Sequence, residues 1–108
     1  MTFRMPQNLS TKPASETGAD VLEVELLAER AAALGRGGRD VETALERLRE
    51  FDATGAGPVP RAELVAAAAD AVWGFLVHRE LCGLRDRDDV IRHYRIPREV
   101  LNQLGARR

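Results

Sequence analysis

The side chains best suited to chemistry in this chain are His78, Cys82 and His93. His78 and Cys82 are four residues apart, so on a helix they lie one turn from each other. Imidazole and thiolate groups bind zinc, and a cysteine beside a histidine also serves nucleophilic catalysis. The chain has no second closely spaced ligand pair and no acid placed to orient the imidazole. We therefore expect Cys82 to be a small buried hydrophobe, and we predict no catalytic residue, no metal, no cofactor and no enzyme activity.

Oxygen-bearing side chains recur in the stretch FDATGAGPVPRAEL, residues 51–64. Calcium loops require oxygen ligands at alternating positions, a glycine at the sharp turn and a final carboxylate. Asp52, Thr54 and Glu63 stand at such positions, and the stretch resembles the calcium loop of the EF-hand family. An alanine and a proline replace two of the usual ligands, so only two carboxylates remain. Calcium binding is therefore our second alternative function.

The stretch DRDDVIRHYRIPREVLNQLG, residues 86–105, has the apolar spacing of two short helices packed at a fixed angle. It resembles a helix-turn-helix DNA-binding unit, with Arg98, Asn102 and Gln103 as the implied base-reading residues. The second helix is short, Arg95 replaces the usual turn glycine and Glu99 repels phosphate. DNA binding is the first alternative function. The buried positions of this unit are predicted to be Val90, Tyr94, Ile96, Leu101 and Leu104.

The charge balance of the chain excludes a global attraction to polyanions. Sixteen Lys and Arg residues against seventeen Asp and Glu residues leave a net charge of −1. Residues 79–108 hold eight Arg against five acidic residues, so any attraction to nucleic acid is local. One cysteine and no signal-type amino terminus predict a cytoplasmic protein, and the longest apolar run is too short to span a membrane.

Hydrophobic periodicity predicts helices throughout the chain and no strand. Asp20 and Glu23 fit a capping box, and Gly35 fits a helix stop, with GRGGRD as the connection to the next helix. Pro60 is expected to open the third helix, Gly83 to end it, and Asp86 to cap the fourth. The expected helices cover residues 20–35, 40–51, 60–82, 86–94 and 97–105.

The apolar faces of these helices predict the core. Helix one presents Val21, Val24, Leu27, Ala28 and Ala31, which Leu22 and Leu26 widen, and helix two presents Val41, Ala44, Leu45, Leu48 and Phe51. Helix three is apolar nearly all round, so we expect it to be the structural centre. Its large residues Trp73, Phe75 and Leu76 point around so much of its circumference that several neighbours must cover them.

These patterns predict an all-α fold, a compact bundle of four to five helices with an N-terminal tail. We place the tail at residues 1–15 and a single helical domain at residues 16–108, since 108 residues form one core.

The function that this pattern favours is binding to other proteins, as a small non-enzymatic adaptor or regulatory protein. Helix three has more apolar surface than four short partners hide, so we predict a homodimer through helix one or three. The protein partner is not identified, nucleic acid is the less favoured partner, and no membrane is expected.

Four stretches carry a wider likeness: DVLEVELLAERAAALGR, ALERLREFDA, HRELCGLRD and YRIPREVLNQLG. They resemble a family of short bacterial proteins of unknown function, and the likeness covers most of the chain after the tail. The resemblance implies that the helical unit is the family's domain. It implies no activity, ligand or catalytic residue.

Overall fold

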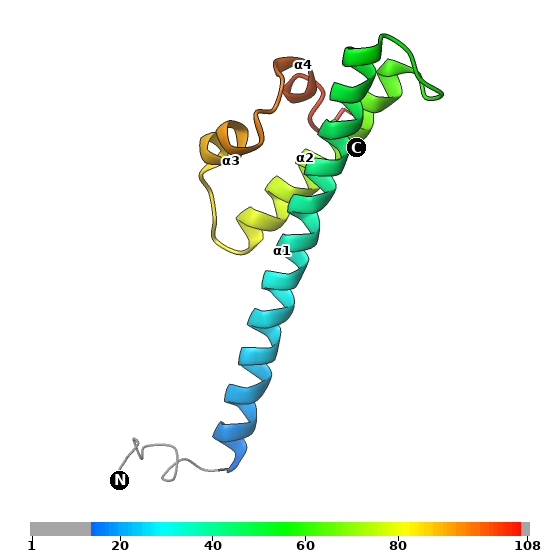
Figure 1. Cartoon of the computed structure of the whole chain (residues 1–108). Helices are drawn as coiled ribbons and strands as arrows, with labels where there is room; N and C mark the ends of the chain where they lie inside the picture. Colours follow the sequence, from blue (N-terminus) through cyan, green and yellow to red (C-terminus); the bar gives the residue numbers. More distant parts are fainter. Residues whose placement is uncertain (1–13, 107–108) are drawn as a thin grey trace. The chain divides into compact units, whose positions relative to one another are not determined.

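The computed structural model of the chain describes residues 14–106, and the side chains of residues 18–106. Within these residues the chain forms four helices and no strand (Figure 1). They are α1 (Ala14–Thr54), α2 (Arg61–Leu81), α3 (Arg87–Tyr94) and α4 (Arg98–Leu101). The all-α prediction is confirmed. Most of the predicted tail, residues 1–13, lies outside the described residues.

The chain divides into two units, residues 1–32 and residues 33–108. That residues 16–108 form one domain, and that the helices form one compact bundle, stay predictions. No helix among the described residues combines the length and the hydropathy that crossing a bilayer requires.

The largest correction concerns α1, which is one helix of 41 residues where two were predicted. Asp20 lies inside this helix, so it is not an N-cap, and Gly35 does not end it. The predicted connection GRGGRD is helical throughout. The glycine signal was therefore interpreted wrongly, because a glycine inside a helix can also mark close packing.

Close packing is what the structure shows at Gly37 and Gly38. A Cβ atom added to Gly38 would lie 2.6 Å from the hydroxyl oxygen of Tyr94, and one added to Gly37 would lie 3.0 Å from Cδ1 of Phe75. Any larger residue would meet these rings. The two glycines form a notch in α1 that receives a ring from α2 and a ring from α3.

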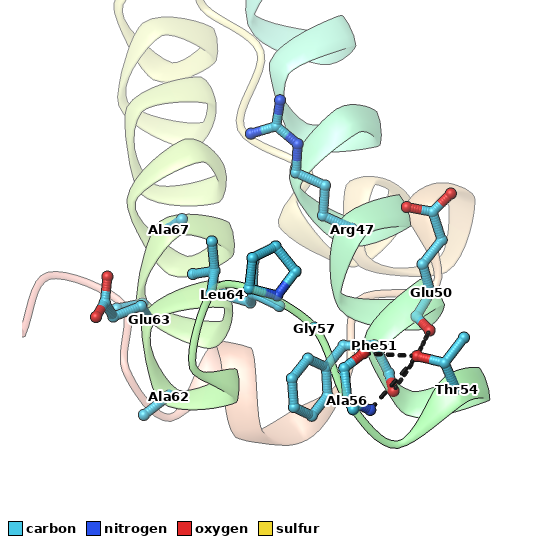
Figure 2. A pocket seen from close by; sticks show the side chains of 13 residues that line it. Arg47, Glu50, Phe51, Thr54, Ala56, Gly57, Ala62, Glu63, Leu64 and Ala67 are labelled. Carbon is cyan, nitrogen blue, oxygen red and sulfur yellow. Dashed lines mark hydrogen bonds between the residues drawn. The ribbon is translucent and has the colours of Figure 1, made fainter.

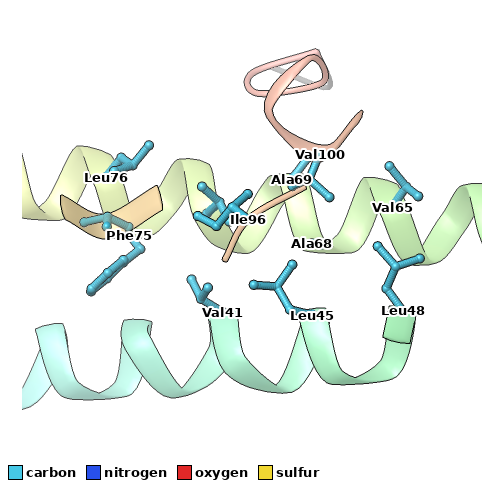
Figure 3. Close-up of a cluster of buried hydrophobic side chains, with 12 residues drawn as sticks. Val41, Leu45, Leu48, Val65, Ala68, Ala69, Phe75, Leu76, Ile96 and Val100 are labelled. Carbon is cyan, nitrogen blue, oxygen red and sulfur yellow. The ribbon is translucent and has the colours of Figure 1, made fainter. Parts of the chain in front are cut away.

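The core of residues 33–108 lies between α1 and α2 and is closed by the carboxyl-terminal segments (Figure 3). Val41, Leu45 and Leu48 of α1 face the α2 side chains, as the periodicity of helix two predicted. From the carboxyl-terminal part come Val90, Ile96 and Val100. The buried α2 residues are Val65, Ala68, Ala69, Val72, Phe75 and Leu76.

The predicted central role of helix three is confirmed for Phe75 and Leu76, and only in part for Trp73. Phe75 is 7% exposed and meets the Tyr94 ring edge to face, with centroids 5.7 Å apart. Leu76 is buried as well. Trp73 is only half-buried, and its ring faces Gly105, whose added Cβ would lie 3.5 Å from it. Segments from three parts of the chain therefore cover the large residues of α2.

Beyond residue 59, the predicted helix ends are correct except for the last one. Pro60 is the N-cap of α2, and Gly83, just past its end, has φ +86°. The Asp86 side chain accepts a hydrogen bond from the Asp89 amide at 3.1 Å and caps α3. Pro97 precedes α4, but α4 ends at Leu101 and only turns follow, so the last helix is shorter than predicted.

The described part of residues 1–32 is the first half of α1, and its large aliphatic side chains are exposed. Val24 is 65% exposed and Leu27 57%. An α-helix advances about 100° per residue, so Leu22 and Leu26 lie on the side opposite to Val24. They therefore form a second apolar stripe and do not widen the first one.

Candidate functional site

A groove lies where α1 ends and α2 begins (Figure 2). Its volume is about 920 Å³, and its lining is mostly apolar. All of the lining residues come from residues 47–67, so α3 and α4 contribute none of them. They are Arg47, Glu50, Phe51, Thr54, Ala56, Gly57, Pro58, Val59, Ala62, Glu63, Leu64, Ala66 and Ala67.

The turn that closes the groove is held by Thr54. Its hydroxyl lies 2.7 Å from the Ala56 carbonyl oxygen and 3.1 Å from that of Glu50, within donor reach of both. The Gly55 amide donates to the Phe51 carbonyl at 2.7 Å, which satisfies one of the last carbonyls of α1. Gly57 then lies flat against the Phe51 ring, since an added Cβ would be 3.3 Å from it. The groove is therefore formed by local hydrogen bonds and packing.

Acidic side chains predominate along the groove. Glu50 and Glu63 line it, and Arg47 is the single basic residue among its lining residues. A second, smaller hollow adjoins it on α1 and shares Arg47 and Glu50 with it. That hollow adds Glu42 and Glu46. Glu46 is paired with Arg49 at 3.9 Å, so three carboxylates, those of Glu42, Glu50 and Glu63, remain beside Arg47.

Arg61 lies at the start of α2 between two carboxylates. Its guanidinium donates to Asp52 Oδ1 at 2.7 Å and to Glu99 Oε2 at 2.9 Å, which joins the end of α1 and the α4 helix to α2. The hydrogen bonds from Arg61 lower the pKa of Asp52 and the pKa of Glu99 below their ordinary values. The hydrogen bonds that Arg61 donates to Glu99 and Asp52 in turn raise the pKa of Arg61. The cluster is exposed, so it orients three segments more than it stabilises them.

The residues predicted to bind calcium are divided between the groove and the Arg61 cluster. Thr54 and Glu63 line the groove, whereas the Asp52 carboxylate is bound by Arg61 through both of its oxygens. The Thr54 hydroxyl is occupied by backbone carbonyls. Gly57 and Val59 belong to the groove wall. This arrangement does not favour a calcium loop, because its first carboxylate already has a cation.

The helix-turn-helix alternative is matched in its buried positions. Val90 and Ile96 are buried, and Tyr94 packs against the core; Leu101 and Leu104 do the same. Arg95, at the position of the usual turn glycine, is left-handed with φ 53°. Val100 is fully buried and was missed by the sequence prediction.

The base-reading half of that unit is weaker. Arg98, Asn102 and Gln103 are exposed, but α4 has four residues, and the last two of the three lie at its C-cap and in the following turn. Glu99 pairs with Arg61, which holds an acidic group on the face that would meet phosphate. A recognition helix needs several turns to place side chains along a groove of DNA. The geometry of α4 therefore supports DNA binding less than the apolar spacing of residues 86–105 does.

The residues His78, Cys82 and His93 are not gathered into a site. Among the described residues, no group of three or more His, Cys, Asp and Glu side chains lies close enough to hold a metal ion. Cys82 is half-buried at the C-cap of α2, and the His93 ring lies edge to face with Tyr94 at 4.7 Å. His93 therefore belongs to the aromatic cluster around Phe75.

Sequence reasoning missed the groove itself. Its signal was the combination of Pro58 and Val59 in a glycine-rich turn, an aromatic residue at the end of α1, and alanines at 62, 66 and 67. Ala62 and Ala67 are exposed and Ala66 is only partly buried, and all three line an open groove.

Comparison with known proteins gives a family and no activity. No curated protein and no solved structure matches the chain. The model of a family described as "Family of unknown function (DUF6665)" matches residues 1–108, and the chain therefore belongs to that family.

Proposed function

We propose that this protein acts by binding other proteins, as a small non-enzymatic adaptor or regulatory protein that also associates with itself. The observation that carries the proposal is the exposed aliphatic surface in the first half of α1. Val21, Leu22, Val24, Leu26 and Leu27 are each at least 50% exposed. These residues form two apolar stripes on opposite sides of the helix, and exposed apolar surface of this kind usually marks a protein contact.

Self-association is supported by the spacing of these residues. Val24, Leu27 and Ala31 follow the alternating three- and four-residue spacing by which helices pack against each other. The same spacing continues through Leu34, Gly38, Val41, Leu45 and Leu48. Within residues 33–108, α2 and the carboxyl-terminal segments cover it. A second copy of α1 would supply an equivalent aliphatic surface for Val24 and Leu27, which supports a homodimer through helix one.

Sedimentation equilibrium of the full chain tests self-association. We expect a mass that rises with concentration from 11.9 kDa toward twice that value. The double variant Val24→Ser and Leu27→Ser should stay monomeric, because each serine removes apolar surface from the contact. Leu81→Ser is the matched control, since Leu81 is exposed at the end of α2. A wild-type protein that remains at 11.9 kDa at every concentration contradicts the dimer.

A further inference from the structure

The groove at the α1–α2 turn has apolar surface that no described side chain fills. Val59 is 40% exposed, Phe51 is half-buried, and the three alanines of α2 leave space in front of them. The hydrogen bonds of Thr54 and the contact of Gly57 with Phe51 hold this surface in place. A preformed surface loses little conformational freedom when a partner binds.

The charges near the groove are acidic because the neighbouring cations are engaged elsewhere. Arg61 is held by Asp52 and Glu99. Arg49 donates to the Tyr94 carbonyl oxygen at 2.9 Å. Arg49 also lies 3.9 Å from the Glu46 carboxylate. Among the lining residues, Glu42, Glu50 and Glu63 then remain against Arg47. The field at the groove therefore attracts positive charge.

The two hollows together are elongated. They run along α1 from Glu42 to Thr54, which at 1.5 Å per residue is a length of about 18 Å. This length corresponds to roughly three turns of a partner helix. A compact small molecule would occupy only the larger of the two hollows.

We propose that this groove binds a basic amphipathic segment of another protein, whose aliphatic side chains contact Phe51 and Val59 and whose Lys or Arg residues face the glutamates. The proposal goes beyond self-association, because it concerns residues 42–67 and not the exposed face of residues 21–27. The glutamates along the groove select a partner of positive charge. The small side chains of Ala62, Ala66 and Ala67 leave room for the partner's side chains.

The test uses the full chain and two synthetic peptides of about 14 residues, long enough to span the two hollows. One combines Leu at helical three- and four-residue spacing with Lys, and the other has Glu in place of every Lys. Fluorescence anisotropy should show that the Leu/Lys peptide binds and that added salt weakens its binding. The Leu/Glu peptide should not bind.

Matched variants test whether the peptide binds in the groove. Glu63→Lys and Val59→Ser should each weaken binding by about tenfold, because the first reverses a rim charge and the second removes an apolar contact. Glu80→Lys and Leu81→Ser, which change a glutamate and an exposed aliphatic residue at the carboxyl-terminal end of α2, should alter it by less than about twofold. Circular dichroism of each variant confirms that the helices are retained.

Three results would overturn the proposal. The first is no binding of the Leu/Lys peptide at low salt, or equal binding of both peptides. The second is equal effects of the groove variants and their controls. The third is loss of binding in the Val24→Ser and Leu27→Ser double variant with the groove variants unaffected, which would place the peptide on the exposed face of α1.

Discussion

Two stretches of α1 have the same apolar spacing but opposite surroundings. Val24 and Leu27 are more than half exposed, whereas Val41 and Leu45 are at most 1% exposed. The difference does not lie in α1, since both stretches are helical and aliphatic. It lies in the segments that cover the second stretch, above all α2 with its ring at Phe75. Periodicity therefore predicts which face of a helix is apolar, but not whether the chain itself covers that face.

Among these variants, Phe75→Ala should lower the stability of the covered stretch most. The ring fills the notch at Gly37 and Gly38 and contacts Tyr94, so its loss leaves a cavity. We expect the free energy of unfolding to fall by about 3 to 5 kcal/mol, a large part of the stability of a domain. Urea denaturation measures it.

Leu27→Ala is the matched control for that change. Leu27 is 57% exposed, so at a concentration too low for self-association its loss should change stability by less than about 0.5 kcal/mol. An unchanged urea midpoint for Phe75→Ala, or an equal loss for both variants, would contradict the comparison.

Gly38→Ala tests whether the notch requires glycine for the close packing of the Tyr94 ring. Alanine favours the helix by about 1 kcal/mol, but its Cβ would lie 2.6 Å from the Tyr94 hydroxyl oxygen. Tyr94 is held by ring contacts with Phe75 and His93. We expect overpacking to prevail, with a net loss of about 1 kcal/mol in thermal or chemical denaturation.

The rescue and the control for Gly38→Ala come from the same region. Adding Tyr94→Phe removes the atom that the new Cβ meets, so the double variant should regain the lost stability. Gly35→Ala meets only Arg39 Nη1, at 3.5 Å, and should stabilise the fold by about 0.5 to 1 kcal/mol. A stabilising Gly38→Ala would show that the notch has room.

Arg61→Gln tests how the ion pairs with Asp52 and Glu99 affect the free energy of unfolding at acid pH. The lowered pKa values of Asp52 and Glu99 mean that their contribution is complete above about pH 5 and is lost as the pH falls through the lowered values. Without the guanidinium, both pKa values should rise toward ordinary ones, and stability should depend less on pH in this acid range. Carboxyl NMR titrations measure the pKa values directly.

Arg92→Gln is the control for this titration. Arg92 approaches Asp89 at 4.0 Å, away from the Arg61 cluster, so its loss should leave the pKa values of Asp52 and Glu99 unchanged. Equal titration of these carboxyls with and without Arg61 would show that the ion pairs do not persist in solution.

The smallest expected effect is that of calcium. Because Asp52 is paired with Arg61, millimolar calcium should leave the melting temperature unchanged. A calcium-dependent rise in melting temperature that Glu63→Gln abolishes would instead support the calcium loop.

Signals that act within a few residues predicted the fold well. The Asp86 cap and the prolines at 60 and 97 specify helix starts through local hydrogen bonds and a fixed φ. Asp20 and Gly35 were interpreted wrongly, because α1 begins before Asp20 and continues past Gly35 into the segment that packs against rings at Gly37 and Gly38. Rings from α2 and α3 pack against Gly37 and Gly38 of α1, and no local pattern contains these contacts.

The candidate site was less predictable. Phe51 was predicted as a core residue, yet it is half-buried and forms a wall of the groove. The groove exists because α3 and α4 add no residue to it, a property of the packing that the residues lining it do not encode. Arg61 was not singled out either, since its partners are 9 and 38 residues away.

The notch at Gly37 and Gly38 has a consequence for the order in which the chain folds. With Gly35, it places three glycines within four residues, each costing about 1 kcal/mol of helix relative to alanine. Before Phe75 and Tyr94 dock, this segment has little local reason to be helical, and amides near Val41 should exchange with solvent readily. We expect docking of the rings to join two shorter helices into one. The helicity of residues 35–38 should therefore report whether Phe75 and Tyr94 are in place.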